Sequence, residues 1–156
     1  MAEISLEQAL QQIVDQAKEV STELPIKDKA KITKAGAKVF KRELEQTYHN
    51  KHYRNRKTGE NPHLADTVLM QNTNIDGRRT GNSTVGWGKD KAYIANFLEN
   101  GTRYPLYTSK GHAHKNGGEV AINGDKTIDK LRHDPRVRQM IAEAEAKEYR
   151  KIVNKK

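Results

Sequence analysis

The first 25 residues place apolar side chains at a helical period. These side chains recur every three or four residues, at Leu6, Leu10, Ile13, Ala17, Val20 and Leu24. Such spacing lines them up on one face of a helix. Ser5 and Gln8 match a capping box at the start, and Pro25 disfavours helical geometry in the residue before it. The pattern therefore predicts a helix over residues 5–23.

A second helix is predicted over about residues 28–48. Its apolar face is formed by Ile32, Ala35, Val39, Phe40 and Leu44. The opposite face carries a row of lysines at the same period, which we call the lysine stripe: Lys27, Lys31, Lys34, Lys38 and Lys41. Such a row is typical of a solvated helix face, and it also suits a contact with phosphates or with an acidic neighbour.

The helical period ends in the polar segment 46–62. Tyr48, Tyr53 and Arg54 stand there among further cationic side chains, a mixture that suits stacking on nucleic-acid bases. A polar stretch bounded by Gly, Asn and Pro is more typical of a surface loop. We therefore expect a mobile loop over about residues 46–62.

The middle of the chain predicts a small antiparallel sheet and a short helix. Residues 67–74 and 83–88 are the expected strands, joined by a turn at Asp76-Gly77. Residues 91–101 are expected to form a helix that packs its apolar side on the sheet and ends at a glycine able to take positive φ. The structural residues expected around this contact are Trp87, Ile94, Phe97, Leu98 and Gly101.

The last third predicts a loop, a hairpin and a helix. Residues 104–118 contain one proline and three glycines and have no helical period, so we expect a second long, mobile loop. Residues 119–128 form a candidate hairpin around Asn123-Gly124. Asp134 followed by proline is typical of a helix start, and this helix is expected to run to about residue 153.

The order of these elements indicates an α+β fold in a single domain over residues 1–156. Long N-terminal helices are followed by a small, mostly antiparallel sheet with a short packing helix, and then by a C-terminal helix. Only 34% of the residues are hydrophobic, which leaves a monomer little material for a core. We therefore expect the chain to bury apolar surface against other subunits. No run of apolar residues is long enough to predict a membrane span.

Charge is segregated along the chain, which carries a formal net charge of +9. Residues 1–26 contain five acidic residues and one basic residue, whereas residues 27–57 contain eleven basic residues and three acidic ones. A basic block beside an acidic one favours an electrostatic contact surface. Its partner could be nucleic acid, another subunit, or the first helix of the chain itself.

The residue types that carry catalysis do not combine into a recognisable site. The chain has no cysteine, which excludes a disulfide framework, a thiol nucleophile and a thiolate metal site. The segment 49–52 places two histidines around Asn and Lys, too close together for a His-Asn-His nuclease. His112, His114 and His133 have a spacing that could converge on a metal, but nothing fixes the loop that carries His112 and His114, and no acidic ligand flanks that loop closely. We expect no enzymatic activity, no cofactor and no metal.

Four segments, taken in order, resemble one family. They are Lys34–Phe40 (KAGAKVF), His63–Val68 (HLADTV), the Gly86–Gly88 strand (GWG) and Ala92–Arg103 (AYIANFLENGTR). Together they are similar to the gene-product-ten-like neck or tail-component proteins of long-tailed bacteriophages. The resemblance covers roughly residues 30–103, and its most specific part is Tyr93–Thr102.

The resemblance implies a virion structural protein at the head–tail junction, which assembles in the host cytoplasm and works as part of a ring. Its partners would be further copies of the chain and the neighbouring connector, head-closure or tail proteins, with only non-specific contact to DNA in the lumen. Glu99 and Arg103 are expected near a subunit contact, together with the lysine stripe. The alternative from the residues alone is a small basic nucleic-acid-binding protein that uses this stripe.

Overall fold

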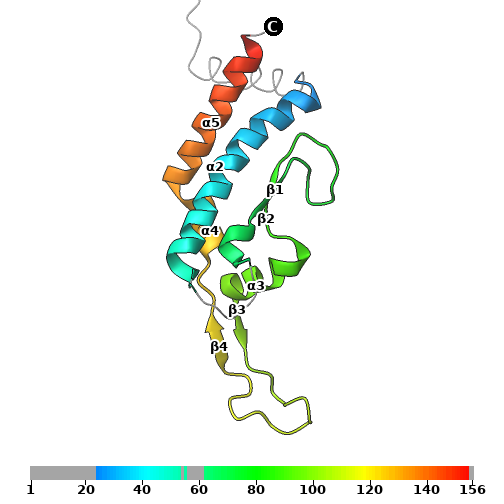
Figure 1. The fold of residues 1–156 in the computed structure, drawn as a ribbon, viewed down its shortest axis with the longest axis vertical. Helices are drawn as coiled ribbons and strands as arrows, with labels where there is room; N and C mark the ends of the chain where they lie inside the picture. The colour runs from blue at the N-terminus through cyan, green and yellow to red at the C-terminus, as the bar shows by residue number, and fades with distance from the viewer. Residues whose placement is uncertain (1–23, 54, 56–61, 155–156) are drawn as a thin grey trace, which may run out of the picture.

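The computed structural model describes residues 24–53, 55 and 62–154. Its elements are α2 (Ile26–His52), the 3-10 helix η1 (Leu64–Thr67), β1 (Leu69–Gln71), β2 (Thr84–Gly86), α3 (Lys89–Asn100), β3 (Gly101–Arg103), β4 (Val120–Asn123), α4 (Thr127–His133) and α5 (Pro135–Val153). The molecule is elongated, with α2 and α5 side by side at one end and β3 and β4 projecting at the other (Figure 1). The α+β class predicted from the sequence is confirmed. The helix predicted over residues 5–23 lies outside the described residues.

The two long helices run antiparallel and make the most extensive contact between elements. Near the start of α5, Arg136 Nη2 donates to Glu43 Oε2 of α2 over 2.6 Å. Further along α5, the Glu145 side chain lies against Gly36, where a Cβ atom would collide with its carboxylate. The start of α5 thus lies beside residue 43 of α2, and residue 145 lies beside residue 36, so the two helices run in opposite directions. The absence of a side chain at Gly36 lets the helices approach closely.

Helix α2 confirms the second predicted helix but continues beyond it. The sequence predicts a loop from residue 46, whereas residues 46–52 remain helical. The physical reason is burial, because the side chain of Tyr48 is fully enclosed. Thr47 Oγ1 also donates back to the Glu43 carbonyl oxygen over 2.7 Å, which occupies its hydroxyl within the helix. The expectation of a loop is therefore wrong as far as His52.

The core gathers where the second half of α2 meets η1, α3, α4 and the start of α5. Its buried members are Leu44, Tyr48, Leu64, Ala65, Val68, Ala95, Leu131 and Val137. Trp87 lies at the edge of this cluster, and its Nε1 donates to the Leu64 carbonyl oxygen over 2.9 Å. The indole ring is tilted against the ring of Tyr48, with centroids 4.9 Å apart. One aromatic pair thus joins α2 to the chain that follows β2.

Helix α3 turns only part of its predicted apolar face to the core. Ile94 and Leu98 pack against the core cluster, and Ala95 belongs to it. Phe97 was expected to point inward as well, but it is 42% exposed. It lies one position away from the buried face and meets Tyr93 edge-on, with centroids 5.9 Å apart. The inward face is therefore narrower than predicted and includes the small residue Ala95.

The predicted small sheet is two separate two-stranded antiparallel sheets. In the first, β1 pairs with β2 and Met70 stands opposite Val85. The first strand is shorter than the predicted 67–74 because the preceding residues form η1, where His63 Nδ1 accepts from the Ala65 N–H over 3.2 Å. The predicted turn lies between these strands, and Gly77 adopts a positive φ of 79°.

The second sheet corrects the predicted hairpin over residues 119–128. Strand β4 pairs with β3 instead, Thr102 standing opposite Ile122, and residues 127–133 form α4. Tertiary contact overrides the local turn signal, because Asp125 N–H donates to the Leu98 carbonyl oxygen over 3.0 Å. Gly124 packs on the backbone at the end of α3, where a Cβ atom would stand 2.6 Å from the Asn100 carbonyl carbon.

Helix α5 begins and ends where the sequence predicts. Asp134 accepts from the Arg136 N–H over 2.8 Å and caps the helix, with proline at the first helical position. The helix ends at Val153. No helix within the described residues is long and apolar enough to cross a membrane.

Candidate assembly interface

Residues 101–123 form a projection that we call the arm: β3, the segment 104–119, and β4. The sequence predicts a long loop for most of this segment, but its backbone is paired. Tyr104 N–H donates to the Glu119 carbonyl oxygen over 2.9 Å, and His114 N–H donates to that of Leu106 over 2.8 Å. An isolated bridge joins Tyr107 to Ala113. The arm is therefore an irregular hairpin that points away from the α2–α5 pair (Figure 1).

Side chains reinforce this hairpin without building a core. The rings of Tyr104 and His114 stack, with centroids 5.3 Å apart. Arg103 donates from its guanidinium to the Gly118 carbonyl oxygen over 2.9 Å. The backbone of Gly117 lies close to that of Leu106, where a Cβ atom would come within 2.9 Å of the carbonyl oxygen. Backbone pairing and close packing thus shape the arm.

The apolar side chains of the arm remain exposed. Leu106 and Tyr107 are each 64% exposed, and Val120 and Ile122 are about half exposed. Several exposed apolar side chains on one projecting element are typical of a protein–protein contact. The arm is also basic, since it carries one arginine, two lysines and two histidines against the single acidic residue Glu119.

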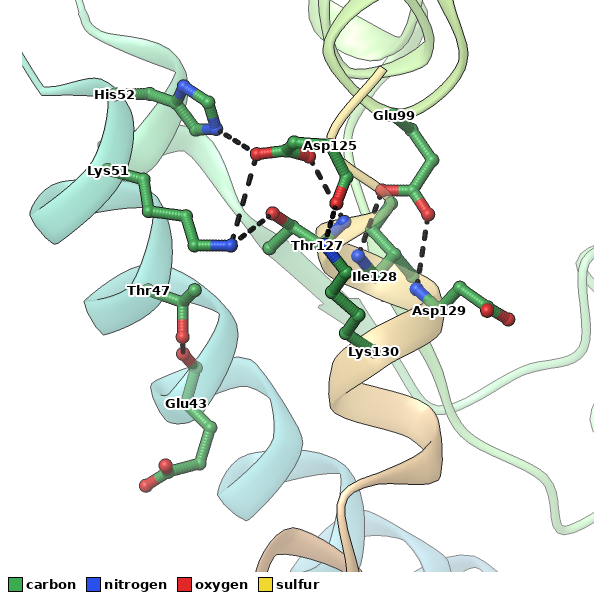
Figure 2. A network of polar contacts seen from close by, with 10 residues as sticks. All are labelled: Glu43, Thr47, Lys51, His52, Glu99, Asp125, Thr127, Ile128, Asp129 and Lys130. Carbon is green, nitrogen blue, oxygen red and sulfur yellow. Dashed lines mark hydrogen bonds and ion pairs between the residues drawn. The ribbon is translucent and has the colours of Figure 1, made fainter. Parts of the chain in front are cut away.

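The base of the arm is held by a network of polar contacts (Figure 2). The Glu99 carboxylate accepts from the backbone N–H groups of Ile128 and Asp129, over 2.9 Å and 3.1 Å. These are otherwise unsatisfied donors in the first turn of α4. Lys126 Nζ donates to the Asn100 side-chain oxygen over 2.7 Å. These contacts join the end of α3, just before the arm, to the start of α4, just after it.

Asp125 extends this network to α2. His52 Nε2 and Asp125 Oδ2 are 2.7 Å apart, and the Thr127 N–H donates to the other carboxylate oxygen over 3.1 Å. Lys51 Nζ reaches the Thr127 hydroxyl over 3.0 Å. Burial alone would raise the pKa of Asp125, but the hydrogen bonds from Thr127 and His52 outweigh it and lower that pKa below its ordinary value.

The network gives Glu99 and Arg103 partners within the chain. Glu99 is predicted near a subunit contact, and in the structure its carboxylate caps α4. Arg103 donates within the arm. Sequence reasoning also missed His52 and Asp125. A helix predicted as far as residue 52 would have placed His49 and His52 on one face. In the structure, His49 Nε2 lies 2.7 Å from Asp66 Oδ1.

A groove of about 560 Å³ runs along the α2–α5 pair, and we call it the α2–α5 groove. Its apolar lining comes from Ala37, Phe40, Val85 and Ile141, and Ile75 stands at its rim with 92% of its surface exposed. Thr33 Oγ1 donates to the Gly81 carbonyl oxygen over 2.7 Å. This bond fixes the β1–β2 connection against α2 and so forms one wall of the groove.

Glu145 contributes a carboxylate to the α2–α5 groove. Among the residues that the structure describes, this carboxylate has neither a hydrogen bond nor an ion pair. Burial raises its pKa above the ordinary value for a glutamate, since a partly dehydrated carboxylate without a partner favours its neutral form. Arg132 and Arg138 also line the groove. The groove thus combines apolar walls with charges of both signs.

The lysine stripe lies on α2 opposite the buried positions. Lys31 pairs with Asp28 over 2.7 Å, and Lys41 pairs with Glu45 over 3.2 Å. Lys27, Lys34 and Lys38 are exposed and make no ion pair with any other described residue. Part of the stripe is therefore available to a partner.

The three candidate metal-binding histidines are not brought together. His114 stacks on Tyr104 within the arm, whereas His133 Nδ1 lies 2.8 Å from the Asp129 carbonyl oxygen at the end of α4. No group of three or more His, Asp or Glu side chains within the described ranges could hold a metal ion. The features left for function are surfaces: the arm, the α2–α5 groove and the lysine stripe.

Comparison with known proteins gives one match. The family described as "Bacteriophage HK97-gp10, putative tail-component" matches residues 11–101, which is more than half of the chain. Searches of curated proteins and of solved structures found no match. The matched range ends at the residue where the arm begins. The groove walls from α2 and β2 lie inside that range, whereas the arm and α5 lie beyond it.

Proposed function

The chain belongs to the HK97-gp10-like family of bacteriophage tail components, and from this premise we propose that it is a ring-forming subunit of the neck, at the junction of head and tail. Its family gives it a structural role in the phage tail. The proposal adds the position at the neck, the ring and the contacts that close it. It assigns the chain no chemical reaction.

The observation that carries the proposal is the exposed apolar surface of the arm. Leu106 and Tyr107 project from a backbone that is paired across the arm, the His114 N–H donating to the Leu106 carbonyl oxygen. Burying apolar surface yields about 25 cal/mol per Å², and a monomer gains none of this from side chains that face water. A second copy of the chain can supply the missing contact. Because the same surface recurs on every copy, a head-to-tail contact repeats from copy to copy, and the proposed ring forms when the rotation between copies closes.

The charged surfaces are proposed to meet neighbouring components of the virion. Lys27, Lys34 and Lys38 suit an acidic patch on a connector, head-closure or tail protein, or the phosphates of DNA passing through the lumen. Arg103 lies at the base of the arm, beside the proposed subunit contact. The stripe has no interleaved Asn, Gln or Arg that could read base edges. Any affinity for DNA is therefore expected to fall steeply with salt and to ignore sequence.

The experiment measures the mass of the purified chain by light scattering, over a range of concentrations and with or without DNA, and its copy number in isolated virion necks. We expect one closed ring in each neck, and a mass in solution that rises with concentration toward that of the ring. A single copy in each neck would contradict the proposal. Complexes that form only with DNA and tighten on a preferred sequence would favour the nucleic-acid-binding alternative.

A further inference from the structure

We propose that the arm of one subunit occupies the α2–α5 groove of the next copy of the chain. This inference rests on the proposed ring and names the contact that would build it. The occupant is a second copy of this chain, and the two surfaces are the apolar side of the arm and the groove between α2, β2 and α5.

The first argument is that, within the described residues, the arm does not reach the α2–α5 groove of its own molecule. The arm projects at the end of the molecule opposite the α2–α5 pair and points away from it (Figure 1). Leu106 and Tyr107 are consequently exposed in the same molecule whose groove is open and whose Ile75 is 92% exposed. An arm that enters a groove joins two different surfaces, so the contact runs head to tail. Contacts of this kind generate rings when the rotation between copies closes.

The second argument is that the two surfaces are alike in polarity, since both present apolar side chains. The arm is a narrow element with its apolar residues at the surface, and the groove has apolar walls about Phe40, Val85 and Ile141. The wall from the β1–β2 connection is held to α2 through Thr33, which bonds both the Gly81 carbonyl oxygen and the Ser83 hydroxyl. A groove that is already formed costs little ordering when it is filled.

The third argument is charge. The tip of the arm carries Lys110 and Lys115 and no acidic residue, whereas the groove holds the carboxylate of Glu145 without a partner among the described residues. A lysine from the next copy would give this half-buried carboxylate the ion pair that it lacks. In the other direction, Glu119 on the arm suits the arginines at the edge of the groove. Two local pairs, a tip lysine with Glu145 and Glu119 with an arginine of the groove, therefore support the contact, while the arm as a whole is basic.

Cross-linking can test this contact cleanly because the chain contains no cysteine. One preparation carries Ser109→Cys at the tip of the arm, and a second, isotopically labelled preparation carries Ile75→Cys at the rim of the groove. The two are mixed at high protein concentration and treated with a short bis-maleimide. A third preparation with Val153→Cys, on exposed α5 outside both surfaces, replaces the groove variant as the matched control. Both Ser109 and Ile75 are exposed, so neither substitution threatens the fold.

We expect cross-linked dimers that contain one labelled and one unlabelled chain, at least tenfold more abundant than those with the Val153→Cys control. Equal yields with the groove variant and the control would overturn the inference, as would links that join only like with like. The second variant test is Leu106→Asp, which should reduce the yield to that of the control. A ring seen in necks without tip-to-groove links would refute this contact and leave the proposed function standing. Necks with one copy would refute the proposed function itself.

Discussion

The body of the molecule and its arm satisfy their side chains in opposite ways. In the body, Leu44, Tyr48 and Val137 are buried together, and the charge of Glu43 is paired with Arg136. In the arm, the backbone is paired while Leu106 and Tyr107 face water. The body thus has what it needs to fold, whereas the arm has a fixed shape and unused apolar surface. This difference is the basis of our proposal that the arm contacts another molecule.

The largest expected effect is the difference in unfolding free energy between a leucine-to-alanine substitution in the body and one in the arm. Leu44 is 1% exposed and Leu106 is 64% exposed. Leu44→Ala should lower the free energy of unfolding by about 2–5 kcal/mol, because it leaves a cavity in the core. Leu106→Ala should change it by less than about 0.5 kcal/mol. Urea unfolding of both variants measures the difference, and a large loss for Leu106→Ala would show that the arm packs on its own chain.

The next effect concerns the joint between the two regions. Glu99→Ala removes the acceptor of two N–H groups in the first turn of α4, and should cost about 1–2 kcal/mol of stability. The variant should still fold, but amide exchange at the base of the arm should accelerate. Glu99→Gln keeps one oxygen acceptor and should lose less. If Glu99→Ala unfolds at the same urea concentration as the parent and only assembly is impaired, then the carboxylate acts on a partner and the cap contributes little.

The pH dependence should also differ between the joint and the groove. The pKa of Asp125 is lowered in the folded chain, so its stabilisation is present above its ordinary pKa and is lost as the pH falls through the lower folded value. Asp125→Asn should therefore flatten the loss of stability in acid. The pKa of Glu145 is raised, so its carboxyl favours folding below its ordinary pKa, and this contribution is lost as the pH rises through the raised value.

These two carboxyls can be compared directly by thermal melts across the acid range. Glu145→Gln should raise the melting temperature of the free subunit at neutral pH, since it removes a half-buried charge. Asp125→Asn should lower it there. Changes in melting temperature of opposite sign for the two variants support a paired Asp125 and an unpaired Glu145. A fall in melting temperature for Glu145→Gln at neutral pH would indicate a partner for this carboxylate within the chain.

The smallest expected effect lies in the core. The hydroxyl of Tyr48 is buried and has no hydrogen-bond partner among the described residues. Burial raises the pKa of this phenol, with further contributions from Glu99 and Asp125. Tyr48→Phe removes an unsatisfied polar group and keeps the ring contact with Trp87, so stability should rise by up to about 1 kcal/mol. A loss of more than that amount, measured in urea, would mean that the hydroxyl is satisfied in solution.

Local signals sufficed for the helices but not for the connections between them. The period of α2 and the Asp134 cap of α5 are properties of neighbouring residues, so the sequence predicts both helices. The hairpin predicted around Asn123-Gly124 failed because contacts with the end of α3 decide that conformation. The exposure of Phe97 and the capping role of Glu99 could not be predicted for a related reason. Their orientation depends on how closely α3 approaches the core and on the position of α4, and neither is encoded in the segment itself.

The candidate surfaces also divide into one that a local pattern predicts and two that depend on contacts between distant segments. The lysine stripe is a helical period and was visible in the sequence. The paired arm was not visible in the sequence, because its glycines and proline are typical of a loop. The bonds that shape it join residues apart in the sequence, such as Leu106 with His114 and Tyr104 with Glu119. The α2–α5 groove requires three elements far apart in the chain, and no local pattern predicts it.

The measurement that tests the account most directly is a reconstruction of the virion neck that resolves individual copies of this chain. The account predicts a closed ring in which Leu106 and Tyr107 of each copy are buried in the α2–α5 groove of its neighbour, with a lysine of the arm tip beside Glu145. A single copy, or a ring in which the arms project into water and the grooves stay open, would contradict it.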